Sequence, residues 1–155
     1  MNTNQSANTT TMAVKIVHEN QGKNQNVLGD NQTIKLSSND TNGKFTIVEN
    51  YNAPGTGIPM HVHENEDELF RILEGEMEFD TQGKISVLTA GDMILLPRQI
   101  PHAFRVVGNK NARAMVTVFP SGIEEMFEQL AQLPAGPPDF EKVQNICNSF
   151  GISFL

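Results

Sequence analysis

Three histidines and one glutamate have the residue types and spacing in this sequence that best fit metal chemistry. His61 and His63 stand two residues apart, and on a β-strand that spacing points both imidazoles to one face. Glu68 opens the apolar run of residues 69–73, and His102 opens a third apolar segment. If the three segments are neighbouring strands, all four side chains converge on one point.

Three imidazoles and one carboxylate form a ligand set of intermediate hardness. It suits one divalent transition metal ion, and Fe, Mn, Ni, Co, Cu and Zn all fit it. Four protein ligands leave positions open for a substrate in a metal that prefers five or six. The alternative is a set of interior histidines that hydrogen-bond one another. Burial of three imidazoles and a carboxylate without a cation is costly, so the sequence predicts a metal site.

The segments that must position these residues are short and alternate with turns. Regularly spaced apolar runs with Asn, Asp and Gly between them predict an all-β sandwich or barrel. A tight turn is expected at Asn42-Gly43. The predicted strands cover residues 13–17, 33–36, 44–49, 69–73, 76–80, 84–88, 93–96, 104–107 and 112–119.

Both ends of the chain differ from this pattern. Residues 1–12 are nearly all polar and are expected to form a disordered tail before a β-domain of residues 13–120. Residues 121–155 change to helical spacing. Ser121 and Glu124 fit a capping box that opens the first helix, PAGPP ends it, and Gly151 is expected to stop a second helix. This helical extension is expected to pack on the barrel.

Composition excludes several classes of protein. The chain has 155 residues and a formal net charge of −7, and no basic run, which argues against nucleic-acid binding and against docking on anionic membranes. No apolar stretch is long enough to span a bilayer, and the first residues do not read as a secretory signal. The single cysteine, Cys147, excludes an intramolecular disulfide, and a cytoplasmic location is expected.

At the histidine segment the sequence resembles the cupin superfamily. The first cupin motif is matched at every fixed position: Pro54-Gly55, five residues, His61-Val62-His63, four residues, Glu68, six residues and Gly75. The second motif is matched at Gly91, Pro97 and His102. Gln99 replaces its glycine and Val106 its asparagine. Neither departure removes a metal ligand.

The resemblance implies a double-stranded β-helix, or jelly roll, with two C-terminal helices. It carries over His61, His63, Glu68 and His102 as metal ligands, and Gly55, Gly75 and Gly91 as turn glycines. A shorter spacing in the first motif would make Asp67 the carboxylate ligand. The gap to Gly75 and the alternation with Phe70 and Ile72 favour Glu68. Cupins of this size are commonly homodimers, so a homodimer is expected.

A narrower resemblance, to small cupins of the quercetin 2,3-dioxygenase type, implies a metal-dependent dioxygenase acting on a small aromatic or enolic substrate. Glu68 would be the catalytic base. An apolar substrate pocket is predicted from Met60, Phe70, Ile72, Met93, Phe104 and Val106.

Two alternatives stay open. One is a metal-dependent isomerase or decarboxylase of a small acid, which would need a cation in the pocket. Arg71 and Arg105 alternate away from it. The other is a cupin without catalytic activity that binds a small molecule or a metal.

Overall fold

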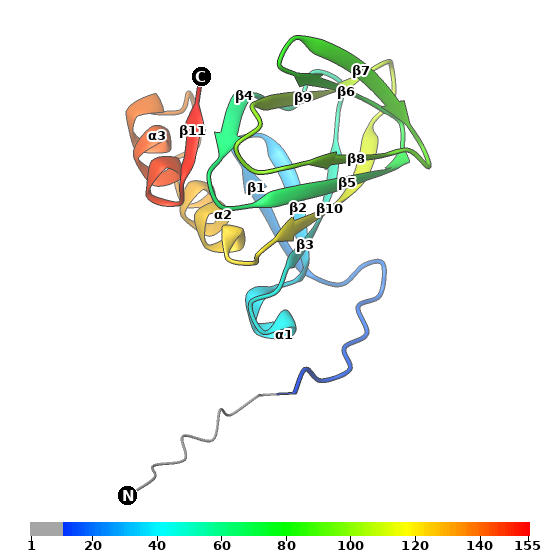
Figure 1. Cartoon of the computed structure of the whole chain (residues 1–155), viewed down its shortest axis with the longest axis vertical. Helices are drawn as coiled ribbons and strands as arrows, with labels where there is room; N and C mark the ends of the chain where they lie inside the picture. The colour runs from blue at the N-terminus through cyan, green and yellow to red at the C-terminus, as the bar shows by residue number, and fades with distance from the viewer. Residues whose placement is uncertain (1–10) are drawn as a thin grey trace, which may run out of the picture.

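The computed structural model describes residues 11–155, and its strands form two antiparallel sheets that face each other (Figure 1). This confirms the predicted double-stranded β-helix. One sheet has the order β1 (Lys23–Val27), β2 (Asp30–Leu36), β3 (Thr46–Asn52), β10 (Ala112–Phe119), β5 (Asp67–Glu74) and β8 (Met93–Leu96). The other has the order β11 (Ile152–Phe154), β4 (Gly57–His63), β9 (His102–Val107), β6 (Glu76–Thr81) and β7 (Lys84–Thr89).

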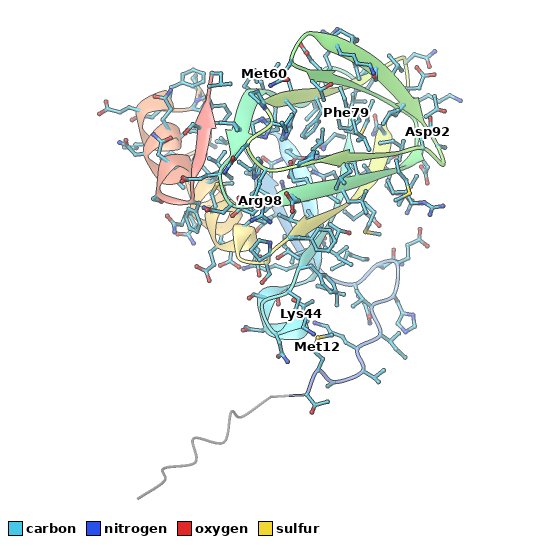
Figure 2. All side chains as sticks on the ribbon, viewed as in Figure 1. Met12, Lys44, Met60, Phe79, Asp92 and Arg98 are labelled. Carbon is cyan, nitrogen blue, oxygen red and sulfur yellow. The ribbon has the colours of Figure 1, made fainter. Side chains whose placement is uncertain are left out.

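Strand alternation produces the core between the sheets. Along β10 every second residue from Ala112 to Val118 is buried, as the period of a pleated strand requires. Phe70, Phe79 and Phe104 meet in the middle, with ring centroids 5.2 to 6.0 Å apart. Phe79 is fully buried between the sheets (Figure 2). A buried phenylalanine contributes about 1.5–3 kcal/mol to folding, so this cluster is a main source of stability.

The first predicted strand is wrong. Residues 13–17 form no strand, and Val14 is 96% exposed. The first strand starts at Lys23, in a polar segment that has no apolar alternation. It forms because β2 pairs with it through a hairpin, whose turn at Leu28 and Gly29 has positive φ angles of 54° and 97°. Most of the predicted disordered tail lies outside the described residues.

A short helix, α1 (Ser38–Thr41), replaces the predicted tight turn between β2 and β3. The Asp40 carboxylate accepts a hydrogen bond from the Ser37 backbone N–H at 2.8 Å, which stabilises the first turn of this helix. Asn42 and Gly43 both have positive φ angles, as Asn-Gly favours. They end the short helix, however, and do not form the predicted tight turn.

The C-terminal extension contains the two predicted helices, α2 (Ile123–Ala131) and α3 (Phe140–Ser149), and one strand that was not predicted, β11. In Figure 1 all three lie together at one end of the barrel, with β11 beside β4, α3 against β11 and α2 against β1. The buried Cys147 packs among the apolar side chains of this region, as predicted. No helix of residues 11–155 has the length and apolar character that a membrane crossing requires.

The predicted capping box at Ser121 is wrong, because Glu124 turns inward. The helix begins after Gly122, and the Ser121 hydroxyl pairs with that of Ser38. The buried Glu124 carboxylate accepts hydrogen bonds from the Ser38 backbone N–H at 2.6 Å, the Thr46 hydroxyl at 2.5 Å and the Gly122 N–H at 2.9 Å. This carboxylate ties α2 to α1 and β3.

Glu124→Ala is expected to lower the free energy of unfolding by about 3 kcal/mol, because it leaves several buried donors without an acceptor. Burial alone would raise the pKa of Glu124, but the hydrogen bonds from Thr46 and Ser38 lower it. The stabilisation is therefore full above the ordinary carboxyl pKa and is lost as the pH falls below it. Urea titration at two pH values measures both effects. The exposed neighbour variant Glu125→Ala is the control, and equal losses in the two variants would contradict the role of Glu124.

Candidate metal centre

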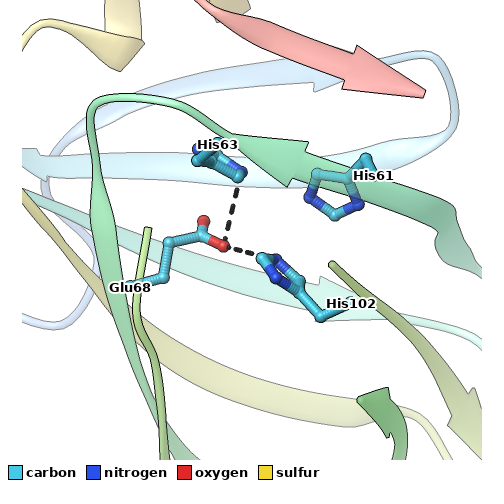
Figure 3. A group of neighbouring side chains, drawn as sticks. All are labelled: His61, His63, Glu68 and His102. Carbon is cyan, nitrogen blue, oxygen red and sulfur yellow. Dashed lines mark hydrogen bonds and ion pairs between the residues drawn. The ribbon is translucent and has the colours of Figure 1, made fainter. Parts of the chain in front are cut away.

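The four predicted ligands are brought together by three strands from the two sheets. β4 carries His61 and His63 on its inward face, and His61 pairs in register with His102 at the start of β9. Glu68 is the first buried residue of β5, in the opposite sheet. Figure 3 shows the Glu68 carboxylate reaching across the interior to His63 and His102.

The ligand atoms lie close enough to share one ion. One ligand atom from each of the four side chains lies within 4.8 Å of the other three. Glu68 Oε2 is 3.0 Å from His102 Nε2 and 3.5 Å from His63 Nε2. All four residues are at most 6% exposed. The cluster is therefore enclosed in protein and is not a chance meeting of surface side chains.

The other ring nitrogen of each histidine is held by an acceptor. Nδ1 of His61 lies 2.9 Å from the Pro59 carbonyl oxygen, and Nδ1 of His102 lies 2.9 Å from that of Ile100. Nδ1 of His63 lies 3.3 Å from Glu66 Oε2. Because these partners only accept, Nδ1 carries the proton in each ring, and Nε2 is left with its lone pair. That arrangement orients histidines for metal ligation.

The Nε2 lone pair of His102 then faces the Glu68 carboxylate at 3.0 Å. Two acceptors at that distance repel each other unless a positive charge lies with them. That charge is either a proton or a metal ion. The donor set, three imidazoles and one carboxylate, fits a divalent transition metal.

The pKa values of the metal-site residues depend on burial and on the charges of their neighbours, which act in opposite directions. Burial, together with the neighbouring His102, lowers the pKa of His61 to about 4, so this ring is neutral and ready to ligate. Burial alone would lower the pKa of His63, but the carboxylates of Glu68 and Glu66 outweigh it and raise that pKa. Burial would raise the pKa of Glu68, but His63 and His102 lower it. The proton that a metal must displace therefore resides mainly between His63 and Glu68.

Metal affinity is expected to fall about tenfold per pH unit once the pH drops below the raised pKa of His63, because one proton then competes with the metal. Because the pKa of His63 is raised, its ring stays protonated to a higher pH. The loss of metal affinity therefore begins above the ordinary histidine pKa of 6.5. Competition titration with a chromogenic zinc chelator between pH 5.5 and 8.5 measures it. An affinity that is flat over this range would contradict a histidine ligand with a raised pKa.

The choice between Asp67 and Glu68 is settled by strand alternation. Asp67 points outward and pairs with Arg98, whose Nη2 lies 2.9 Å from its Oδ2. Hydrogen bonds from Arg98 lower the pKa of Asp67 to about 2. Arg98, labelled in Figure 2, is exposed to solvent. The carboxylate in the cluster is therefore Glu68, as the motif spacing predicts.

A mainly apolar cavity adjoins the cluster, and His61, His63 and Glu68 form part of its wall. The cavity has a volume of about 100 Å³. An apolar cavity of about 150 Å³ holds one benzene ring, so the space here corresponds to about one small ring. That is the size of a small organic molecule.

Only part of the predicted pocket lines this cavity. Phe70 and Phe104 do. Ile72 and Val106 are buried but lie one inward position further along β5 and β9, so they belong to the core. Met93 is 51% exposed on the outer face of β8, and Met60 faces away from His61 by alternation. These four assignments were wrong because side-chain type does not reveal the face or the depth of a residue.

The rest of the wall consists of residues that were not predicted to line a pocket. Met126, Phe127 and Leu130 of α2, Val143 and Cys147 of α3, and Ile152 and Phe154 of β11 close one side. β11 pairs directly with the ligand strand, Ile152 opposite His63 and Phe154 opposite His61. The apolar stripes of the two helices predicted that one face of each helix packs against another part of the protein. Their contact with this cavity depends on the tertiary fold.

The comparisons with known proteins agree with this site. Residues 52–119 match the family model described as a cupin domain. The chain is 32% identical over 94 residues to quercetin 2,3-dioxygenase of Bacillus subtilis and 33% identical over 67 residues to the polyketide synthase CurC of Streptomyces cyaneus. It spans 27% and 44% of the lengths of these two curated relatives.

A solved structure is also similar. The polyketide cyclase RemF from Streptomyces resistomycificus superimposes with a TM-score of 0.58 at 27% identity, over 70% of this chain and 80% of that one. The family match covers both motifs, from before Pro54 to beyond His102. Together with the two-sheet fold and the four converging side chains, it shows that residues 52–119 form a cupin domain.

Proposed function

We propose that this cupin is a metal-dependent oxidoreductase of the dioxygenase type, acting on a small aromatic or enolic substrate. The observation that carries the proposal is the buried cluster itself, in which His102 Nε2 and Glu68 Oε2 face each other at 3.0 Å beside an apolar cavity. His61, His63, Glu68 and His102 would hold the metal. The similarity to quercetin 2,3-dioxygenase supports the reaction type.

A divalent transition metal bound here would supply polarisation of a substrate oxygen and, if redox-active, reaction with dioxygen. The protein supplies the rest. Phe70 and Phe104 line the apolar cavity and would hold an aromatic ring. Glu68 would accept the proton of an enolic or phenolic hydroxyl on Oε1, the oxygen that does not contact His102.

A metal-dependent cyclase is the second candidate. The similarity to RemF and to CurC supports it, because both names refer to polyketides. Glu68 would then also serve as the base, and dioxygen would not be consumed. The predicted alternative of an isomerase or decarboxylase of a small acid is less well supported. Among the described residues that line the cavity, none is Arg or Lys, so nothing there would hold an anion.

Oxygen consumption separates these candidates. The protein would be loaded in turn with Fe(II), Mn(II), Co(II), Ni(II) and Cu(II), and offered quercetin and catechol. We expect substrate-dependent oxygen uptake with at least one metal and none with Zn(II), which has no redox chemistry. A product that forms equally well without oxygen would favour the cyclase. Lack of turnover with every metal would favour a binding protein. The expected homodimer stays a prediction that sedimentation velocity can check.

A further inference from the structure

Residues 64–68 carry four carboxylates, and the structure turns them in different directions. Asp67 faces outward, and Glu68 faces the histidines of the metal site. Glu66 lies in the turn between β4 and β5, and its Oε2 is 3.3 Å from Nδ1 of His63. The first cupin motif specifies no residue at this position, so the motif alone does not predict the contact.

This contact makes His63 different from the other two histidines of the site. Nδ1 of His61 and Nδ1 of His102 each lie 2.9 Å from a neutral backbone carbonyl oxygen. Nδ1 of His63 faces a carboxylate instead. The separation is longer than in the two carbonyl contacts, but the attraction of a full charge falls off slowly with distance. A carboxylate on the Nδ1–H also makes Nε2 of the same ring a better electron donor.

The pair is largely shielded from water. The side chain of His63 is 4% exposed and that of Glu66 is 12% exposed. A charge that water does not surround is screened less, so it acts more strongly on a neighbouring dipole than it would at the surface. The carboxylate of Glu66 can therefore act on the ring of His63 across this distance.

The backbone on both sides of Glu66 is held by hydrogen bonds. The Glu64 N–H donates to the Gly151 carbonyl oxygen at 2.8 Å, just before β11. The Asp67 carboxylate accepts from the Arg98 N–H at 2.8 Å. Because the turn is fixed at both ends, the side chain of Glu66 approaches the histidine from a defined position and loses little further freedom when it binds.

We propose that Glu66 is a positioning residue of the metal site. Its carboxylate accepts a hydrogen bond from the Nδ1–H of His63, fixes the ring so that Nε2 points to the metal, and strengthens Nε2 as a ligand. The inference rests on the metal site of the proposed function and is independent of the reaction that takes place there.

The first test is zinc affinity, measured at one fixed pH by competition with a chromogenic chelator. Glu66→Ala should bind Zn(II) about 10- to 100-fold more weakly than the wild type, the usual cost of losing a residue that orients a ligand. Glu66→Gln keeps the length of the side chain and one oxygen acceptor, so it should recover part of the loss. Glu64→Gln, an exposed neighbour, is the control and should bind as the wild type does.

The second test follows each imidazole separately by nuclear magnetic resonance. Zinc-loaded protein with isotope-labelled histidine gives a ring N–H signal for each ligand. We expect the Nδ1–H signal of His63 to move in Glu66→Gln and to be lost through exchange with water in Glu66→Ala. The signals of His61 and His102 should stay in place, because backbone carbonyls hold them. A residue that only stabilised the turn would not act on one ring alone.

Three results would overturn the proposal. One is a zinc affinity of Glu66→Ala within about twofold of the wild type, far short of the effect of an orienting residue. Another is a His63 signal that stays in place in both variants. The third is a shift of all three ring signals together, which a general change of the fold would cause. Circular dichroism of the metal-free variants should match the wild type, and if Glu66→Ala does not fold, Glu66→Gln decides.

The outcome is distinguishable from that of the oxygen-uptake experiment. Zinc binding needs no turnover, so a selective effect on His63 without oxygen uptake by any metal would contradict the dioxygenase and keep the role of Glu66. Oxygen uptake together with unchanged zinc binding in Glu66→Ala would do the reverse.

Discussion

His102→Ala is expected to lower the affinity for Zn(II) more than about 100-fold, since loss of a residue that only orients a ligand already costs 10–100-fold. The imidazole that is lost supplies one of the four candidate ligand atoms, and among the described residues no fifth His, Cys, Asp or Glu belongs to the group. Elemental analysis after dialysis and competition titration with a chromogenic chelator measure the effect.

The fold of His102→Ala should survive, because the phenylalanine cluster and the sheet pairing do not depend on this side chain. The circular dichroism spectrum of the metal-free variant should match that of the wild type. His18→Ala is the matched control, since His18 is exposed and lies outside the cluster. Zinc retained at the wild-type level in His102→Ala would show that the four side chains do not form the metal site.

Glu68→Gln is expected to separate metal binding from proton transfer. The amide oxygen can still face the histidines, so metal retention should exceed that of His102→Ala. A neutral amide cannot take a proton from a substrate hydroxyl, so kcat should fall about 10²- to 10⁴-fold. Stopped-flow turnover with quercetin, corrected for metal content, measures the loss for the metal that supports activity.

Asp67→Asn is the control for Glu68→Gln, because the two carboxylates are adjacent but Asp67 faces Arg98 outside the barrel. Its kcat should stay within about twofold of the wild type. The rate of Glu68→Gln should also lose the dependence on pH that a base imposes. Wild-type turnover in Glu68→Gln at equal metal content would remove Glu68 as the base and leave it a ligand only.

The four candidate metal ligands meet as predicted, whereas four of the six predicted pocket residues do not line the cavity. Motif spacing specifies which residues of a strand pair share a face, and that is enough to bring His61, His63, Glu68 and His102 together. Whether a residue lines the pocket depends on its position along the strand as well as on the face of the sheet to which its side chain points. Met93 is apolar but lies on the outer face of an edge strand, whereas Ile72 faces inward but lies beyond the phenylalanine cluster.

The other features that were not predicted lie in polar segments of the chain. The strand Lys23–Val27 has little apolar alternation and forms because β2 supplies its hydrogen-bond partners. Four polar residues of β2 and β3 are buried without a sequence signal, since Asp and Asn are ordinarily exposed or in turns: Asp30, Gln32, Asn50 and Asn52. They come from two strands whose pairing places Gln32 opposite Asn50.

By itself the sequence determined the cupin class, the all-β architecture, the two helices and the four converging ligands, because local periodicity and motif spacing are properties of single segments and of neighbouring strands. Only the tertiary structure decided what encloses the site. β11 pairs beside the ligand strand from 89 residues or more along the chain, α2 and α3 close the cavity, and Asn50 faces it from the other sheet. Contacts between such distant segments arise from packing that no local pattern encodes.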